Sequence, residues 1–504
     1  MKSKGAVYLV GAGPGDAGLL TLRGAELLRR ADTVIYDLLV NPSLLRLARA
    51  EAELISRGKR ADVPQEKIND LIIQKAREGK TVVRLKGGDP YIMGRGGEEA
   101  AALAEAKIDF EVVPGVSSIV AVPNYAGIPL THREYCSSFT VFTGHEDDDE
   151  KQAALLYSEI AKIPGTKVAL MGTANLDEWT KALITNGLPP ETPAAIIQWG
   201  TLGKQKSVAG TLGTIASLAK EKKLSPPALV VVGDVVKLRE QLDWFENRPL
   251  FGKRIVVTRA RDQAAEFSQK LAELGADILE IPVIKRALPE NKQDVVDAML
   301  SLNSYDWLVF TSVNGVATFF ELFFRHFHDL RDLGGAKIAA VGPATAAKLR
   351  EMHLQVDITP DEAIGKKIAE TLTKHSSIEN SKICLLRAED ANPDLLQALE
   401  EFGGITDDIA VYKTVAETDN APAAQELLKD GADWLTFTSG STVQFFHVRF
   451  DLPKLLKQFP KMKLASIGPE TSKAIRALGL DPKIEAKEHT CEGLAAELLR
   501  AGKS

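Results

Sequence analysis

Glycines, carboxylates and hydroxyls follow several short apolar runs in the first half of the chain. They occur in VYLVGAGPGD (residues 7–16), VVRLKGGDPYIMGRGGEE (82–99) and VVPGVSSIVA (112–121). A glycine at the end of a strand lets backbone N–H and C=O groups approach a ligand, because no Cβ intervenes. The pattern predicts a pocket that holds a small organic molecule mainly by its main chain.

The spacing of the first turn argues against a dinucleotide. Gly11, Gly13 and Gly15 are spaced G-x-G-x-G, and Asp16 stands where the third glycine of a dinucleotide motif belongs. A carboxylate there repels a pyrophosphate, and Pro14 removes an amide donor that a phosphate uses. S-adenosylmethionine, which carries no phosphate, suits this turn. A nicotinamide enzyme is the alternative interpretation.

Strand and helix signals alternate from residue 5 to about residue 240. Short β-branched runs such as AVYLV, TVVRL and ALVVVG are separated by Ala/Leu/Glu-rich segments such as LRGAELLRRA and EEAAALAEA. This alternation predicts α/β layers. Residues 242–253 (LDWFENRPLFGK) lack a sustained period, and a new strand signal follows them. We therefore expect one domain over residues 1–245 and a second over 250–504.

An internal repeat marks the second half. WLVFTSVNGVATFF begins at residue 307 and WLTFTSGSTVQFF at 434, while KIAAVGPATAAKL begins at 337 and KLASIGPETSKAI at 463. A weaker match relates RIVVTRARDQ (254) to KICLLRAEDA (382). Matches at nearly one spacing predict two related α/β lobes, with a ligand site between them.

Composition limits the classes of partner. The chain has 504 residues, 62 Lys+Arg, 68 Asp+Glu and a net charge of −6. It has no basic block typical of nucleic-acid binding and no apolar run long enough for a membrane span. Cys136, Cys384 and Cys491 lie far apart, which favours a reducing compartment over structural zinc. We expect a cytoplasmic protein that needs no metal.

The residues of the motifs in the first half show a resemblance to a known family. GAGPGDAGLLTLRGAELLRRADTVIYDLLV, RLKGGDPYIMGRGGEE, VPGVSS, AGIPLTHRE and PALVVVGDVVKLR resemble uroporphyrinogen-III C-methyltransferase across residues 5–245. The resemblance implies the two-subdomain α/β fold of tetrapyrrole methylases and a homodimer through this domain. It also implies transfer of two methyl groups from S-adenosylmethionine to uroporphyrinogen III, giving precorrin-2 for sirohaem and cobalamin.

Site residues follow from the same resemblance, position by position. Asp37 matches the family's proton acceptor and Lys59 its proton donor. Taken by itself, an Asp at a strand end also caps helices. Lys59 also suits an exposed pair with Arg60 or binding of substrate carboxylates. The methyl donor is expected to contact Pro14, Gly87, Gly88, Asp89, Ile92, Ser117, Ser118, Met171 and Gly200. Methionine is ordinarily core filling, so only its place in the motif selects Met171.

The implied substrate is rich in carboxylates, so its groove needs cationic groups. Arg95, His132 and Arg133 are candidates from their positions in the motifs. Surface charges or structural ion pairs are the alternative roles for all three.

The second half resembles uroporphyrinogen-III synthase over residues 250–504. The resemblance rests on VFTSVNGV, AAVGPATAAKL, LLRAED, IAVYKT, FTSGSTVQFF and ASIGPETSKAI. It implies a lyase that cyclises hydroxymethylbilane with loss of water. It also implies a two-lobed α/β fold in which the chain leaves the first lobe, builds the second and returns.

Hydroxyl groups at strand ends are the candidate ligands of this acidic substrate. They belong to Thr311, Ser312, Thr345, Thr438, Ser439 and Thr471, and helix capping is their structural role. Tyr412 in AVYKT matches the family's proposed proton donor. The sequence thus predicts a bifunctional enzyme; the alternative is a methyltransferase fused to a non-catalytic tetrapyrrole-binding module.

Overall fold

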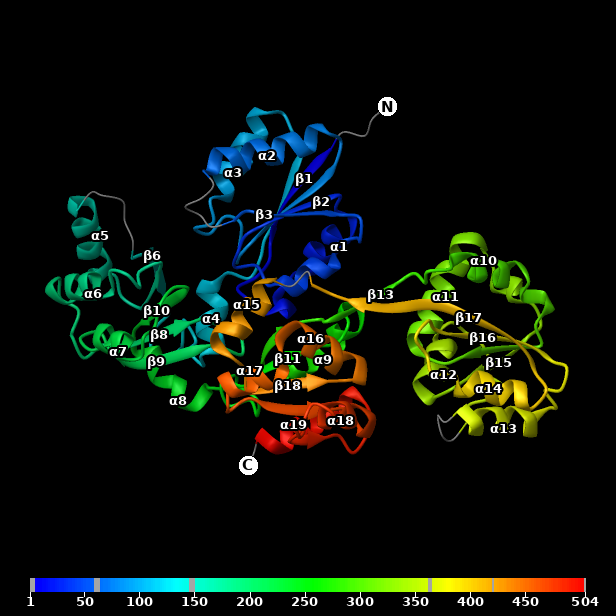
Figure 1. The fold of residues 1–504 in the computed structure, drawn as a ribbon. Coiled ribbons are helices and arrows are strands. Elements are labelled where there is room, and N and C mark those ends of the chain that lie inside the picture. The colour runs from blue at the N-terminus through cyan, green and yellow to red at the C-terminus, as the bar shows by residue number, and fades with distance from the viewer. Residues whose placement is uncertain (1–4, 59–63, 145–149, 361–364, 419–420, 503–504) are drawn as a thin grey trace.

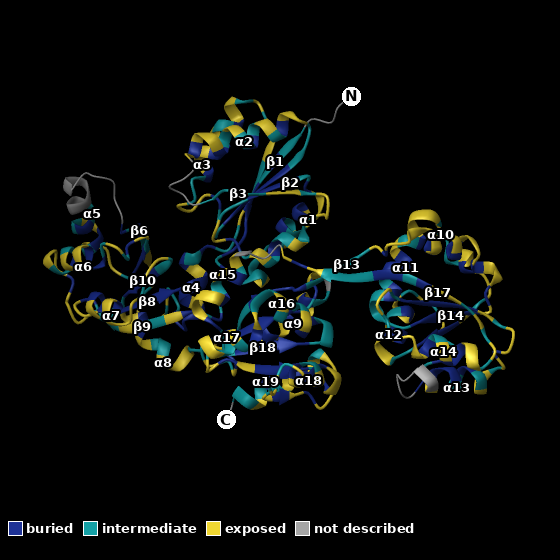
Figure 2. Cartoon of the chain, viewed as in Figure 1, coloured by how far each residue is buried: buried dark blue, intermediate teal, exposed yellow. Residues whose placement is uncertain are grey.

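The computed structural model describes residues 5–58, 64–144, 150–360, 365–418 and 421–502. Within these ranges the strands form four five-stranded sheets, and helices cover both faces of each (Figure 1). Figure 2 shows the strands largely buried beneath those helices. Burial on both faces explains why the strands read as continuous apolar runs, and the predicted α/β class is confirmed.

The first sheet is parallel throughout and has the order β3-β2-β4-β1-β5. Its two faces are buried by apolar residues of α1 and of α2 and α3, respectively. The sequence did not predict the edge strand β3, because its four residues, ELIS, form neither an apolar run nor an alternating pattern. Most of them are exposed in the structure. The elements are β1 (Ala6–Gly11), α1 (Leu22–Arg30), β2 (Thr33–Tyr36), β3 (Glu53–Ser56), α2 (Gln65–Arg77), β4 (Thr81–Lys86), α3 (Gly96–Glu105) and β5 (Phe110–Val113), with 3-10 helices η1 (Ala17–Leu19) and η2 (Pro42–Leu47).

The second sheet is mixed and has the order β6-β7-β10-β8-β9. Ile119 and Val122 of α4 pack on one face, and Trp179 and Leu183 of α6 pack on the other. The elements are α4 (Ser118–Tyr125), β6 (Phe139–Thr143), α5 (Glu150–Lys162), β7 (Thr166–Leu170), α6 (Leu176–Thr185), β8 (Pro193–Gln198), β9 (Lys206–Thr211), α7 (Ile215–Glu221), β10 (Ala228–Val232), η3 (Asp234–Leu238) and α8 (Arg239–Leu242).

The two remaining sheets form two lobes. The first lobe has the parallel order β12-β11-β18-β19-β20, and the second has the order β13-β17-β16-β14-β15. The first lobe contains β11 (Arg254–Val257), α9 (Arg261–Glu273), β12 (Asp277–Glu280), α15 (Ala421–Asp430), β18 (Trp434–Phe437), α16 (Gly440–Phe450), α17 (Leu452–Gln458), β19 (Lys463–Ser466), α18 (Pro469–Arg476), β20 (Ile484–Glu485) and α19 (Cys491–Gly502).

The second lobe is inserted between β12 and α15 of the first. It contains β13 (Ile284–Ala287), α10 (Lys292–Leu300), η4 (Leu302–Ser304), β14 (Trp307–Phe310), α11 (Val313–His326), η5 (Leu330–Leu333), β15 (Lys337–Ala340), α12 (Pro343–Glu351), α13 (Gly365–His375), β16 (Lys382–Ala388), α14 (Asp394–Glu401) and β17 (Ile405–Ala416).

The chain crosses between the lobes twice. It leaves after β12, enters the second lobe through β13 and returns through the long strand β17, which pairs antiparallel with β13 (Figure 1). The sequence repeat fits this arrangement: β14 lies between β16 and β15 as β18 lies between β11 and β19. The two predicted lobes and the crossing are confirmed. In the described ranges, no helix is both long and apolar enough to span a membrane.

Candidate active sites

The carboxyl ends of the first sheet bring separated motifs together. Because β2, β4, β1 and β5 are parallel neighbours, the residues that follow them meet at one edge. There Gly13 and Gly88 form a backbone bridge, with N of Gly13 donating to O of Gly88 (3.3 Å) and N of Gly88 donating to O of Gly13 (2.8 Å). The GAGPGD and KGGDP turns are therefore directly joined.

A third turn completes this edge, and its packing requires glycine. A Cβ on Gly115 would lie 2.2 Å from the carbonyl oxygen of Gly88 and 2.7 Å from Cα of Gly11. Asp89 fixes the arrangement, because its Oδ2 accepts from N of Gly115 (3.0 Å) and its Oδ1 from N of Tyr91 (2.9 Å). We call Gly11, Gly88 and Gly115 the glycine junction.

The residues predicted to contact the methyl donor near the glycine junction differ in their packing. Gly87 is half-buried, and a Cβ there would make one ordinary contact, with Cβ of Leu39 at 3.8 Å. Pro14 is half-buried. Ser117 caps α4 by accepting from N of Ile119 (3.3 Å), and Ser118 is the first residue of that helix.

The second subdomain reaches the same turn through the loop after β8. Thr201 Oγ1 accepts from the backbone N of Asp16 (3.0 Å). Gly200 packs against α4, where a Cβ would lie 2.5 Å from Cγ1 of Val122. Trp199 and Thr201 have φ of 51° and 71°, a strained region for these residue types that is enriched at functional sites.

Met171 lies at the end of β7 and is not core filling. Its side chain is 46% exposed and its φ is 53°. The preceding Leu170 packs against the hydrophobic cluster to which Ile119 and Val122 of α4 belong. The structure thus excludes the alternative of an ordinary core methionine.

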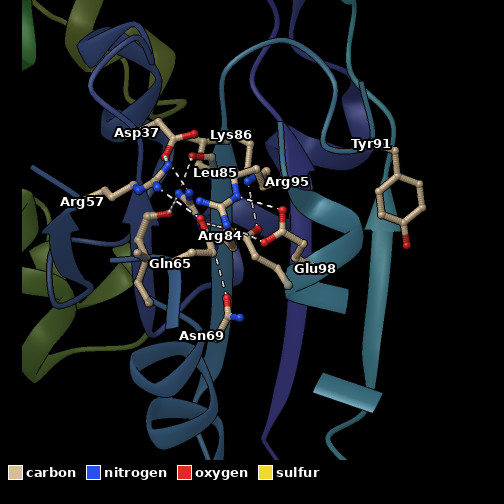
Figure 3. Close-up of polar contacts among 12 residues, drawn as sticks. Asp37, Arg57, Gln65, Asn69, Arg84, Leu85, Lys86, Tyr91, Arg95 and Glu98 are labelled. Carbon is tan, nitrogen blue, oxygen red and sulfur yellow. Dashed lines mark hydrogen bonds and ion pairs between the residues drawn. The ribbon is translucent and has the colours of Figure 1, made fainter. Parts of the chain in front are cut away.

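Asp37 is held by a buried arginine. Arg84 Nη2 donates to Asp37 Oδ1 (2.5 Å), and Arg57 Nη1 lies 3.7 Å from the same oxygen (Figure 3). The helix-capping alternative for Asp37 is wrong, because Asn41 caps the following 3-10 helix. The side chain of Asp37 remains partly exposed while Arg84 is fully buried.

Arg84 belongs to a larger polar network that sequence reasoning missed. Its Nε donates to Glu99 Oε1 (3.1 Å), which also accepts from Gln65 Nε2 (3.1 Å). Lys86 Nζ lies 3.0 Å from Glu99 Oε2 without hydrogen-bond geometry. The available signal was two cations at alternate positions of an otherwise apolar strand, which place both side chains on one face.

The network changes the proton affinity of both cations. Burial opposes the charge of Arg84, but the carboxylates of Asp37 and Glu99 outweigh it and raise the pKa of Arg84. Burial, together with the charge of Arg84, lowers the pKa of Lys86 below its ordinary value.

The side chains predicted to bind substrate carboxylates have different partners and exposures. Arg95 donates to both carboxylate oxygens of Glu98 (2.8 and 2.6 Å), and this pairing raises its pKa. His132 Nδ1 accepts from N of Glu134 (3.2 Å), and Arg133 is exposed. Ile92 is also exposed, within the loop that precedes α3. Lys59 lies outside the described residues.

In the second lobe, two predicted residues from distant segments meet. The hydroxyl of Tyr412 lies 3.2 Å from Oγ of Ser312. Ser312 caps α11 by accepting from N of Gly315 (3.0 Å), and Thr311 Oγ1 donates to O of Leu386 (3.3 Å). A register shift between β16 and β17 at Arg387 precedes Tyr412; such irregularities redirect side chains.

The first lobe repeats this arrangement. Ser439 caps α16 in a reciprocal capping box with Thr442, and Thr438 directly precedes it. Thr345 and Thr471 are buried in the first turns of α12 and α18. Capping is therefore established for Ser312 and Ser439. Gln263 of α9 contacts Asn314 of α11, so the lobes touch next to Ser312.

Comparison with known proteins agrees with this division of the chain. Residues 6–216 match the family model described as Tetrapyrrole (Corrin/Porphyrin) Methylases, and residues 265–496 match Uroporphyrinogen-III synthase HemD. Fold and motifs together define a tetrapyrrole methylase joined to a uroporphyrinogen-III synthase. The chain is 38% identical to the Porphyrin biosynthesis protein HemD of Ruminiclostridium josui, covering 99% of this chain and 98% of that one. It therefore belongs to this family of fused tetrapyrrole-biosynthesis enzymes.

Other relatives match a smaller share of the chain. The Bacillus subtilis uroporphyrinogen-III C-methyltransferase is 39% identical, covering 74% of this chain and 78% of its own. The S-adenosyl-L-methionine-dependent uroporphyrinogen III methyltransferase of Methanosarcina barkeri is 50% identical, covering 47% and 94%. A solved Thermus thermophilus uroporphyrin-III-C-methyltransferase is 40% identical, covering 47% and 98%, with a TM-score of 0.41.

Within the described part of the chain, no three His, Cys, Asp or Glu side chains gather as ligands for a metal ion.

Proposed function

We propose that the C-terminal half cyclises hydroxymethylbilane to uroporphyrinogen III with loss of water. The N-terminal half then methylates that product twice from S-adenosylmethionine to give precorrin-2. The observation that carries the proposal is the convergence of three glycine turns and Asp37 at one sheet edge. A relative named as an S-adenosylmethionine-dependent uroporphyrinogen III methyltransferase, 50% identical over 241 residues, supports it.

The residues at this edge fit the methyl donor. Gly87 is half-buried and has no Cβ, so a ligand can approach its main chain, which suits a phosphate-free molecule held by backbone groups. The donor, when bound, supplies an electrophilic methyl carbon on a sulfonium. The residues proposed to hold it are Pro14, Gly87, Gly88, Asp89, Ile92, Ser117, Ser118, Met171 and Gly200. Their main task is alignment with the substrate carbon.

Asp37 is the proposed proton acceptor. Attack of a pyrrole carbon on the methyl group releases S-adenosylhomocysteine and leaves positive charge on the pyrrole. Loss of a proton from the ring system discharges this charge, and a positioned carboxylate accepts that proton. Arg84 supports this role by donating to Oδ1 of Asp37 and fixing its position. Lys59 is the proposed donor, while Arg95, His132 and Arg133 are proposed to bind substrate carboxylates.

In the synthase half, Tyr412 is proposed to protonate the departing hydroxyl, which leaves as water. Ser312, 3.2 Å away, supports a defined orientation of the phenol. The N-termini of α11, α12, α16 and α18, with Thr311, Ser312, Thr345, Thr438, Ser439 and Thr471, are proposed to bind carboxylates. Free amides and the helix dipole favour negative charge there. We further propose a cytoplasmic homodimer assembled through residues 1–245.

The proposal is tested by giving the whole protein hydroxymethylbilane and labelled S-adenosylmethionine. We expect labelled dimethylated type III product without any added synthase. Product of the type I isomer only would favour the alternative of a non-catalytic binding module in the second half. Unmethylated type III product would contradict the methyltransferase assignment.

The identity of the first-half ligand has its own test. Calorimetry should detect binding of S-adenosylhomocysteine and not of NADP. Tight NADP binding with no S-adenosylhomocysteine binding would favour the nicotinamide alternative.

A further inference from the structure

Asp16 ends the GAGPGD turn, which is called the donor turn because it is proposed to hold the methyl donor. Two hydrogen bonds hold this residue. Its Oδ2 accepts from the hydroxyl of Tyr125 (2.7 Å), and its backbone N donates to Oγ1 of Thr201 (3.0 Å). Burial and the bond to Asp16 raise the pKa of Tyr125, so the phenol remains a donor. Tyr125 ends α4 and Thr201 follows β8, so both supports come from the second subdomain.

Both supports lead to the same short segment, Trp244–Glu246. The ring of Tyr125 packs against those of Trp244 (4.9 Å between centroids) and Phe245 (4.8 Å). On the other side, N of Thr201 donates to Gln205 Oε1 (2.9 Å). Gln205 Nε2 in turn donates to Glu246 Oε1 (2.8 Å). The GAGPGD turn is thus tied by two paths to residues more than 200 positions away, and Gln205 Nε2 joins the paths by donating to O of Tyr125 (3.2 Å).

Glu246 is itself firmly held. Its carboxylate also accepts from Oγ of Ser207 (2.5 Å) and from Nη2 of Arg239 (2.6 Å). A largely buried carboxylate with several donors is fixed in one orientation and transmits that constraint to the groups bonded to it.

The same segment is continuous with the synthase half. Phe245 is 2% exposed and packs against Phe251 (5.5 Å), and N of Gly252 donates to O of Gly203 (3.1 Å). Leu250 is buried in the core of the first lobe. Residues 244–246 therefore lie between the donor turn and the synthase, beyond the 6–216 match to the methylase family.

We propose that Trp244–Glu246 positions the methyl-donor turn, with Tyr125 and Glu246 as positioning residues that act through Asp16 and Thr201. This inference rests on the proposed binding of the donor at GAGPGD. A donor held mainly by backbone groups depends on a fixed backbone, and a small displacement weakens binding and misaligns the methyl group.

The test uses the full chain with Tyr125→Phe, Glu246→Ala and Glu246→Gln. Tyr125→Phe keeps the ring contacts and loses the bond to Asp16, while Glu246→Gln keeps an acceptor oxygen for Gln205. We expect Tyr125→Phe to weaken S-adenosylhomocysteine binding by about tenfold, as expected for one lost buried hydrogen bond. Glu246→Ala removes the acceptor of Gln205, Ser207 and Arg239 and should weaken binding at least as much. Glu246→Gln should restore part of the affinity. The KM for S-adenosylmethionine should rise more than kcat falls.

A matched control comes from the second lobe. Tyr305 donates to Asp407 Oδ2 (2.6 Å), so Tyr305→Phe removes a similar tyrosine–carboxylate bond far from the donor turn. Its S-adenosylhomocysteine affinity should equal that of the wild type. Synthase activity, measured in every variant, reports whether the chain is folded.

The outcomes distinguish an error in the proposed donor site from an error in the positioning role. No S-adenosylhomocysteine binding by the wild type would contradict the proposed donor site itself. Wild-type binding with unchanged affinity in Tyr125→Phe and Glu246→Ala would overturn the positioning role. A parallel loss of synthase activity in those two variants would also overturn it, because general destabilisation would then explain the result.

Discussion

Arg84 decides how the proposed proton acceptor is held. It is fully buried, and its guanidinium contacts Asp37, Glu99 and the backbone carbonyls of Ile35 and Leu85. A planar fork makes several directed bonds at once, whereas a lysine ammonium is a compact point charge. Geometry at Asp37 therefore depends on arginine rather than on positive charge.

Arg84→Lys should lower kcat for methyl transfer by about ten- to a hundredfold, since it misplaces a general base. The KM for S-adenosylmethionine should change little, and initial rates with labelled donor measure both. Arg387→Lys is the control, because Arg387 makes a similar fork to Asp408 (2.5 Å from both Nε and Nη2) in the second lobe. A wild-type rate in Arg84→Lys would contradict a positioning role for the guanidinium.

Lys86 gives the protein an alkaline dependence of stability. Its folded pKa lies below 10.5, the value expected for the unfolded chain, so the unfolded chain binds the proton more tightly. Below the folded pKa the penalty for burying the ammonium is fully present. Between the two pKa values this penalty disappears as pH rises. The free energy of unfolding therefore increases by about 1.4 kcal/mol for each unit by which the two pKa values differ.

Lys86→Met should remove this contribution. Urea unfolding at a series of pH values, from about pH 8 to the value of free lysine, should give a less positive slope of the free energy of unfolding than in the wild type. Lys181→Met, at an exposed lysine on α6, is the control and should retain the wild-type slope. Equal slopes in Lys86→Met and wild type would show that Lys86 does not titrate in this way.

At the scale of elements, four parallel strands create the first site by ending at the same edge. The glycine junction is possible only because β1, β4 and β5 are adjacent, so that the turns after them approach within backbone contact. The synthase lobes have a different arrangement at their strand ends, a helix whose N-terminus is capped by a serine. It occurs at Ser312 and again at Ser439.

Gly115→Ala should break the junction. Its Cβ would meet the Gly88 carbonyl, a backbone atom already bonded to Gly13, so relief requires the joined turns to separate. We expect S-adenosylhomocysteine binding to weaken by about tenfold or more, measured by calorimetry. Gly97→Ala is the control, because its Cβ meets no described atom within 4 Å. Retained affinity in Gly115→Ala would exclude this junction from the donor site.

At the scale of the whole molecule, the first synthase lobe rests directly on the methyltransferase. Gly203 packs so closely that a Cβ there would lie 2.3 Å from the backbone of Ala276. Lys204 lies 3.5 Å from Glu426, and Arg46 pairs with Glu280. A cavity of about 570 Å³ lies next to Lys204, and Arg254 and Asp277 also line it.

Gly203→Ala should loosen this contact without disrupting either core. We expect faster tryptic cleavage after Lys253, because proteolysis follows the population of opened states. Gel analysis of timed digests measures it, with each activity assayed separately. Gly335→Ala, where a Cβ meets no described atom within 4 Å, is the control. Equal cleavage of the two variants would argue against a close backbone contact between Gly203 and Ala276.

Much of the architecture is readable from the chain itself. Buried strands such as β1 and β4 are runs of apolar residues, so local composition marks them, and the repeated WLVFTS and WLTFTS segments mark two lobes. Strand-end glycines and hydroxyls were also predictable, because side-chain type and neighbouring pattern determine them. Ser312 and Ser439 occupy the predicted cap positions for this reason.

Tertiary structure alone decided which of these residues meet. The exposed strand β3 shows no apolar pattern, and the contacts of Arg84 with Asp37 and Glu99 depend on β4 lying beside β2 and beneath α3. Tyr412 reaches Ser312, and Tyr125 reaches Asp16, across about a hundred positions of sequence. Local sequence sets the propensity of each segment, whereas such pairings depend on strand order and on burial shared by distant segments.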